Sequence, residues 1–157
     1  VEGVKFLQEL GAPAIKIASA EAYDAPLIHA ARDTGLPLIV SLGAASLTHL
    51  IAADILLHCI SHYPSRIEDA NLMAITTWSC GNLVGLSDHT PGYETAIAAT
   101  ALGAVMIEKH FKLDDDCIDA AYSLNPVDFA AMCKAVRAIW HGMGDGVIRP
   151  TCEPRKR

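Results

Sequence analysis

The 157-residue sequence is 52% hydrophobic and 19% charged, a composition typical of a globular domain rather than a disordered chain. Its formal net charge is −6 and it has no basic stripe, so no nucleic-acid partner is expected. No apolar run reaches the ~18 residues of a membrane span, and five cysteines without CxxC spacing favour reduced thiols; we therefore expect a cytoplasmic protein with no membrane partner.

Hydrophobic periodicity predicts helices and short apolar strands in regular alternation. The predicted helices cover residues 1–10, 25–33, 69–78, 93–102 and 125–140. The predicted strands cover residues 14–19, 37–42, 54–59, 83–86 and 104–107. Strands that are continuously apolar and separated by helices predict a parallel sheet, so the fold class is α/β with about five βα units.

The placement of polar residues favours a barrel over a doubly wound sheet. No GxGxxG follows the first strand, which counts against a dinucleotide-binding fold. Polar side chains stand at the carboxyl end of every predicted strand, where a (β/α)8 barrel builds its active site. A full barrel needs ~200–250 residues, so we expect a partial TIM barrel over residues 1–145, followed by a linker or tail over residues 146–157.

Two features of the chain are unusual for a barrel. The connection over residues 44–53 has only ten residues, whereas a parallel crossover usually needs a dozen or more. We expect this connection to be strained or to have lost a piece. The sequence also starts with Val1 inside a predicted helix, and we expect the natural start to lie upstream.

Two histidines, His89 and His110, follow neighbouring predicted strands and are 21 residues apart. That spacing corresponds to about one strand–helix–strand unit, so both imidazoles should lie at the same end of the sheet. Each stands beside a carboxylate, Asp88 or Glu108, that can orient an imidazole or a bound water. Imidazoles with oxygen ligands suit a divalent ion such as Mn²⁺, with Mg²⁺ as the alternative.

A cation and several hydroxyls stand at successive strand ends. Lys16 lies within an apolar strand, where it can pair with a phosphate or serve as a Schiff-base nucleophile. The hydroxyls favour phosphate, because side-chain O–H groups and backbone N–H groups together can surround an anion; they belong to Ser19, Ser41, Ser61 and Ser87.

Six motifs resemble those of the sialic acid synthase family and occur in the same order. They are KIAS at 16–19, LLHC-x-S-x-YP at 56–64, EDANL at 68–72, GLSDHT at 85–90, ALGA at 101–104 and IEKHF at 107–111. The sequence resembles the N-acetylneuraminate, legionaminate and pseudaminate synthases. The resemblance implies a metal-dependent transferase that condenses phosphoenolpyruvate with an N-acetylated hexose and releases phosphate.

The resemblance also implies a role for each candidate residue. His89 and His110 would hold the metal, which would polarise the sugar's aldehyde as a Lewis acid, and Glu108 would help to place a water. Phosphoenolpyruvate would be held by Lys16, Ser19, Ser41, Ser61 and Ser87, and the sugar by Tyr63 and Asp119. The phosphoenolpyruvate methylene would attack the aldehyde, water would add, and phosphate would leave.

Relatives of this family carry three more barrel strands, a catalytic acidic residue and an antifreeze-like domain that reaches a partner subunit's site. The resemblance therefore places this chain at the last five strands of the barrel and implies a homodimer for the full-length protein. Residues 119–126 resemble the pseudaminate branch, whereas His58 before Cys59 resembles the neuraminate branch. Leu42 and Ile60 replace common threonines, and the loop over 112–119 lacks the customary Gly-Pro.

These departures keep two alternatives open. One is an inactive remnant or interaction fragment of such a synthase, and the other is a Schiff-base aldolase that uses Lys16. Because an open five-stranded sheet exposes unpaired edges, we expect the 157 residues alone to fold poorly and to lack synthase activity.

Overall fold

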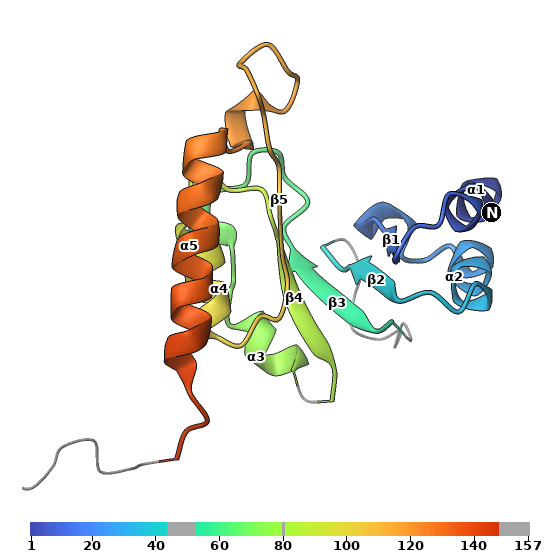
Figure 1. Cartoon of the computed structure of the whole chain (residues 1–157), viewed down its shortest axis with the longest axis horizontal. Coiled ribbons are helices and arrows are strands. Elements are labelled where there is room, and N and C mark those ends of the chain that lie inside the picture. Colours follow the sequence, from blue (N-terminus) through green and yellow to red (C-terminus); the bar gives the residue numbers. More distant parts are fainter. Residues whose placement is uncertain (44–52, 80, 148–157) are drawn as a thin grey trace, which may run out of the picture.

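The computed structural model describes residues 1–43, 53–79 and 81–147. Five parallel strands form one sheet in chain order and curl into a half-barrel (Figure 1). The strands are β1 (Ile15–Ile17), β2 (Leu38–Ser41), β3 (Ile55–Cys59), β4 (Leu83–Asp88) and β5 (Ile107–Lys109). The predicted α/β class with five βα units is confirmed. The short crossover after β2 and the end of the tail lie outside the described residues.

The helices lie on the convex side of the curled sheet (Figure 1). The α-helices are α1 (Glu2–Glu9), α2 (Ala25–Asp33), α3 (Ala74–Trp78), α4 (Glu94–Ala101) and α5 (Pro126–Met143), and short 3-10 turns are η1 (Ser19–Glu21), η2 (Ile67–Asp69) and η3 (Ala120–Tyr122). Asn125 caps α5, since its side chain accepts hydrogen bonds from the N–H groups of Val127 and Asp128. Among the described residues, no helix combines the length and apolar character needed to cross a bilayer.

The strand register assigns each side chain to one face of the sheet, because successive side chains of a strand alternate between faces. The convex face packs against the helices and carries the core residues Ile15, Ile17, Leu38, Val40, Leu56, Val84 and Leu86. The concave face carries Lys16, Ser41, Leu57, Cys59, Gly85, Ser87 and Glu108. The candidate phosphate-binding strand residues thus share the face that helices do not cover.

Two predicted elements were misplaced. The ladder of β5 begins at Ile107, so Glu108 and Lys109 lie within the strand rather than after it. The predicted helix over 69–78 is instead the turn η2 followed by the shorter helix α3. Asn71 separates these two elements with a φ of 42°, a left-handed conformation that interrupts a helix and that Asn tolerates better than most residues.

Gly85 lies where β3, β4 and the segment before β5 come close together. A Cβ at this position would lie 2.5 Å from the carbonyl oxygen of Met106 and 2.6 Å from Leu57 Cδ2. We expect Gly85→Ala to lower the free energy of unfolding by ~1–3 kcal/mol, because backbone must shift to admit the methyl group. Gly142→Ala in α5 is the control, since a Cβ there has no neighbour within 4 Å. Equal urea midpoints for the two variants would contradict this reading.

Candidate functional site

Three of the predicted residues meet at the carboxyl ends of β1, β4 and β5. The Lys16 Nζ lies 3.2 Å from Glu108 Oε1, and the Ser87 hydroxyl donates to the same oxygen at 2.6 Å. The contact follows from the register, because Ser87 and Glu108 are directly paired across the β4–β5 ladder. Lys16 crosses the concave face to reach them, so a cation, a hydroxyl and a carboxylate converge there.

Ser41 and Ser19 also belong to this face of the site. The Ser41 hydroxyl is buried and has no hydrogen-bond partner among the described residues, whereas most buried polar groups are paired. Ser19 is buried in η1 and hydrogen-bonds with the thiol of Cys59. A buried hydroxyl without a partner on an open, cation-bearing face is the kind of group that a bound anion would satisfy.

Cys59 links the serine residues at the end of β3. Its thiol is hydrogen-bonded with Ser61 and with the backbone of Gly43, and burial raises its pKa above the ordinary value. A Cβ on Gly43 would lie 2.5 Å from both Cys59 Sγ and Ser61 Oγ. Only glycine fits at that position, and its absence of a side chain lets the loop after β2 approach the end of β3.

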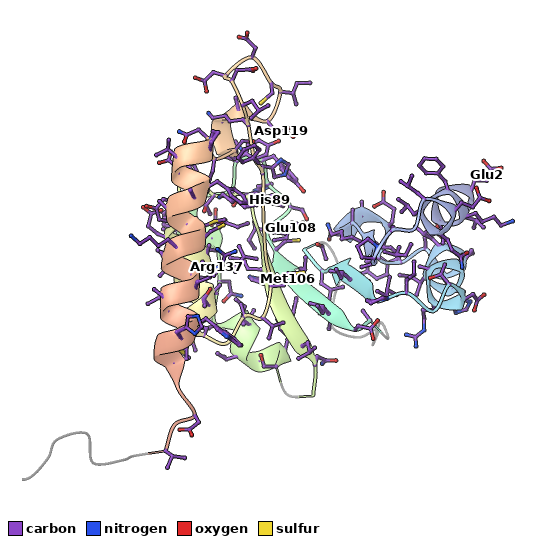
Figure 2. The ribbon with its side chains drawn as sticks, viewed as in Figure 1. Glu2, His89, Met106, Glu108, Asp119 and Arg137 are labelled. Atoms are coloured by element: carbon purple, nitrogen blue, oxygen red, sulfur yellow. The ribbon has the colours of Figure 1, made fainter. Side chains whose placement is uncertain are left out.

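The two histidines lie beside each other beyond the ends of β4 and β5, with ring centroids 5.5 Å apart. Figure 2 labels His89 together with Glu108 and Asp119. His89 Nδ1 lies 2.9 Å from the carbonyl oxygen of Ile60, and because a carbonyl only accepts, this nitrogen must donate. His110 Nδ1 lies 3.2 Å from Asp119 Oδ2. In both rings the Nδ1 is engaged, which leaves Nε2 as the nitrogen with a lone pair for a ligand.

Asp119 and two tyrosines surround the histidine pair. The Tyr122 hydroxyl donates to Asp119 Oδ1, so one carboxylate bridges Tyr122 and His110. This contact with the carboxylate is the main cause that raises the pKa of Tyr122 to about 12. The Tyr63 ring packs against His89 at 4.1 Å between centroids, and burial raises the pKa of Tyr63. The predicted sugar-contacting residues Tyr63 and Asp119 therefore stand directly beside the imidazoles.

The histidine pair fits a divalent ion as two neutral imidazole ligands. An engaged Nδ1 fixes the tautomer that a metal-binding histidine needs, and a carboxylate behind His110 is a common supporting contact. Across residues 1–43, 53–79 and 81–147, no group of three or more His, Cys, Asp or Glu side chains is arranged to hold a metal. An ion bound here would take two nitrogen ligands from the described residues, and its oxygen ligands would come from water or substrate.

Asp88 does not lie on the concave face, and its carboxylate is bound by Lys109, Thr90 and Thr95 rather than by an imidazole. The alternation along β4 turns Asp88 to the convex face, where its carboxylate pairs with Lys109 Nζ at 2.9 Å. It also accepts hydrogen bonds from the Thr90 N–H, the Thr90 hydroxyl and the Thr95 hydroxyl. We therefore assign Asp88 no contact with substrate.

Sequence reasoning did not identify Lys109, which pairs with Asp88, or Tyr122, which donates to Asp119, as neighbours of the candidate site. The signal for Lys109 was its place one residue after Glu108, since alternation along a strand puts neighbours on opposite faces. Tyr122 gave no comparable signal, because its contact with Asp119 depends on how the turn η3 folds.

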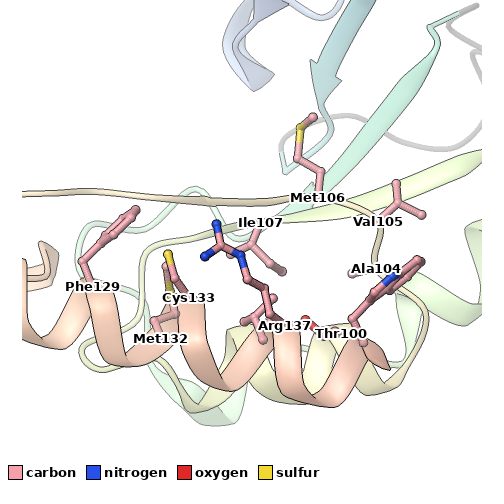
Figure 3. A pocket seen from close by; sticks show the side chains of 11 residues that line it. Thr100, Ala104, Val105, Met106, Ile107, Phe129, Met132, Cys133 and Arg137 are labelled. Carbon is pink, nitrogen blue, oxygen red and sulfur yellow. The ribbon is translucent and has the colours of Figure 1, made fainter. Parts of the chain in front are cut away.

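A separate groove of about 460 Å³ lies between α4, α5 and β5, and Figure 3 shows the Arg137 side chain extending into it. Its lining is mostly apolar and includes Ile107, Phe129, Met132 and Trp140. None of the predicted site residues lines this groove. It is therefore distinct from the group on the concave face.

Burial lowers the pKa of His89 below its ordinary value, so this ring stays neutral at neutral pH. The unfolded chain, with an ordinary histidine pKa of ~6.5, binds a proton more readily than the folded chain. We therefore expect the free energy of unfolding to fall as the pH drops from 7 through the unfolded pKa of ~6.5 and on toward the lower pKa of His89 in the folded protein. Urea unfolding at several pH values checks this, and His89→Asn should lose that part of the pH dependence; an unchanged profile would contradict it.

Comparison with known proteins shows a match over nearly the whole chain. The model of the NeuB family matches residues 1–148. The chain is 40% identical to pseudaminic acid synthase of Helicobacter pylori, covering 92% of this chain and 47% of that protein. It is 34% identical to N,N'-diacetyllegionaminic acid synthase of Campylobacter jejuni, covering 99% and 52%.

The crystal structure of N-acetylneuraminic acid synthetase from Leptospira borgpetersenii, determined with citrate, superposes with a TM-score of 0.90 at 36% identity. The match covers 96% of this chain and 58% of that one. The chain spans about half the length of the curated relatives that it matches.

Proposed function

Because the chain belongs to the NeuB family, we propose that its concave face binds phosphoenolpyruvate and a divalent ion in a synthase of sialic-acid-type sugars. The proposed reaction joins phosphoenolpyruvate to an N-acetylated hexose and releases phosphate. The names of the relatives support the general class, a synthase of this sugar family. The arrangement of the residues supports the finer assignment.

The observation that carries the proposal is the position of the Lys16–Ser87–Glu108 group relative to the histidine pair. His89 and His110 come two residues after Ser87 and Glu108, at the same end of the sheet. An anion held by Lys16 and Ser87 would therefore lie next to an ion held by the imidazoles. A condensation of an anionic enol phosphate with an aldehyde needs both sites side by side.

Glu108 occupies the position that we assign to the substrate anion. Its carboxylate accepts a hydrogen bond from Ser87 and pairs with Lys16. A phosphate carries more charge and more acceptor oxygens than a carboxylate, so Lys16 and Ser87 would transfer their contacts to it. Ser41, whose buried hydroxyl has no partner among the described residues, would donate to the same group.

The acceptor sugar would lie against His89, Tyr63 and Asp119, with its aldehyde toward the imidazole Nε2 atoms. A bound divalent ion, Mn²⁺ or Mg²⁺, would supply Lewis-acid polarisation of that aldehyde. The methylene carbon of phosphoenolpyruvate would form the new C–C bond while the aldehyde oxygen takes a proton from solvent, which the proton lost by the attacking water later replaces. Water would then add at the carbon that bears the phosphate, and phosphate would leave.

Glu108 is the residue that we assign to the water step. Once a phosphate takes over Lys16 and Ser87, the carboxylate is free to accept a proton from the attacking water. Its side chain is 40% exposed, so water reaches it on the concave face. The proposed homodimer follows from the family resemblance, and the proposed cytoplasmic location follows from the cysteine pattern of the sequence.

The contacts of Lys16 favour the phosphate role over a Schiff-base aldolase. An ammonium held by a carboxylate suits anion binding, whereas a Schiff base requires the neutral amine. Borohydride reduction in the presence of substrate separates the two: a covalent adduct on Lys16 would establish the aldolase and exclude our assignment.

The test is phosphate release by the encoded protein, with any flanking sequence that its gene carries. Phosphoenolpyruvate is supplied with Mn²⁺ and a panel of N-acetylated hexoses that includes N-acetylmannosamine. We expect release only when a sugar and the ion are both present, and recovery when Mn²⁺ is restored after chelation. Release that is independent of sugar would contradict the proposed condensation.

A further inference from the structure

We propose that the buried Asp88–Lys109 pair positions His89 relative to His110. The Lys109 and Asp88 side chains are 0% and 2% exposed, and Lys109 Nζ lies 2.9 Å from Asp88 Oδ2. Neither residue faces the substrate side of the sheet. They are therefore positioning residues, each immediately preceding one of the two histidines in the chain.

The pair lies where backbone pairing between β4 and β5 ends. Asp88 and Lys109 are the last partners of that ladder, and His89 and His110 come one residue later. Beyond this point, the backbone ladder no longer sets the distance between the segment that contains His89 and the segment that contains His110. The ion pair adds a side-chain connection at the last paired position, directly below the imidazoles.

Lys109 contacts the chain on both sides of His89, through the side chain of Asp88 and the backbone of Thr90. Its ammonium donates to the side chain of Asp88 and to the backbone carbonyl oxygen of Thr90. The residue between these two contacts is His89. The lysine immediately before His110 thus fixes the segment that contains His89, which couples the positions of the two rings.

The start of α4 completes this network. The Thr95 hydroxyl donates to Asp88 Oδ2 at 2.7 Å, while the Thr90 N–H donates to Asp88 Oδ1 at 2.9 Å. The carboxylate therefore connects β4, β5 and α4. A buried ion pair is often no better for stability than an apolar pair of similar volume. Positioning the two histidines would explain why a charged pair is buried at this point.

The inference rests on the proposed function where it concerns ion binding, but its geometry can be measured without an ion. In the ion-free protein, NMR should detect cross-relaxation between the His89 and Tyr63 rings, whose centroids are 4.1 Å apart. We expect Lys109→Met to weaken this contact and that between the two imidazoles. Lys109→Arg, which keeps the charge, should restore much of both.

Ion binding gives a second readout, through the visible absorption of Co²⁺ titrated into the encoded protein with any flanking sequence that its gene carries. We expect Lys109→Met to weaken Co²⁺ binding about 10- to 100-fold, the usual cost of losing a contact behind a metal ligand, and to change the absorption spectrum. Leu38→Ala is the control, because it removes a core side chain on β2 and lowers stability away from the histidines. Its Co²⁺ affinity should stay within about two-fold of the original.

The outcomes separate the two proposals. If the original chain binds no Co²⁺ but Lys109→Met still disrupts the ring contacts, the ion site is wrong and the positioning role stands. If Lys109→Met lowers stability as Leu38→Ala does but leaves ring contacts and Co²⁺ affinity unchanged, the pair is only structural. That second result would overturn the inference.

Discussion

Replacing His89 with alanine is expected to lower the rate of sugar formation by the encoded protein at least about a thousand-fold. The change removes one of two imidazoles proposed to hold the ion, and charge stabilisation by a bound ion contributes several kcal/mol to such reactions. The ring also packs on Tyr63 at 4.1 Å, so alanine leaves a local gap as well. Coupled phosphate release, measured with saturating Mn²⁺, checks the rate.

A second variant separates ion binding from packing. His89→Asn keeps a donor near the Ile60 carbonyl, which His89 Nδ1 engages at 2.9 Å, but removes the Nε2 nitrogen. We expect it to fold as the original does and still to lose activity. His141→Ala on the exposed side of α5 is the matched control and should keep full activity. Normal turnover in His89→Asn would remove His89 from the site.

Lys16→Met is expected to weaken phosphoenolpyruvate binding about 10- to 100-fold. The change deletes the ammonium that pairs with Glu108 at 3.2 Å, and a hydrogen bond to a charged group contributes ~1.5–3 kcal/mol. The effect should appear in the dissociation constant rather than in stability, because the Lys16 side chain is one-third exposed. Calorimetric titration of phosphoenolpyruvate into the chain measures it.

Two further variants distinguish a direct contact of Lys16 with phosphate from a long-range effect of its charge. Lys5→Met removes an exposed lysine from α1 with the same change in net charge, and it should bind phosphoenolpyruvate normally. Lys16→Arg keeps the charge and should fall between the original and Lys16→Met. If Lys5→Met and Lys16→Met weaken binding equally, long-range charge alone explains the loss, and the assigned phosphate contact is wrong.

The regular alternation of apolar strands and helices was enough to predict the half-barrel and the end of the sheet that carries the site. Polar residues mark where buried strands stop, which is why Ser41 was placed correctly at the end of β2, whereas Ser87 and Glu108 lie inside β4 and β5 rather than after them. The faces were harder to predict. With β4 predicted to end at residue 86, Asp88 counted as a loop residue free to point anywhere.

The structure shows β4 continuing to Asp88 and β5 to Lys109, so alternation applies to both residues. Ser87 and Glu108 then face the site, while Asp88 and Lys109 face the helices. The strand ends could not be set from apolarity alone, because the pair that extends them is charged. Its burial depends on a partner 21 residues away, which only the register of the two strands brings into contact.

Asp119 shows a second limit of sequence reasoning. Family resemblance predicts that it contacts the sugar, and the structure places it beside the histidine pair. Its two oxygens contact Tyr122 and His110. Which of these contacts a bound sugar would replace depends on the fold of the loop before η3, and no local sequence pattern predicts that fold.

The most direct test of the account asks whether phosphoenolpyruvate and the ion bind side by side on the concave face. Mn²⁺ is paramagnetic, so its proximity can be measured through the ³¹P relaxation rate of phosphoenolpyruvate in the presence of the chain. The account predicts relaxation well above that of Mn²⁺ and phosphoenolpyruvate alone, and its loss in both His89→Asn and Lys16→Met. Relaxation that the chain does not enhance, or that neither variant reduces, would contradict it.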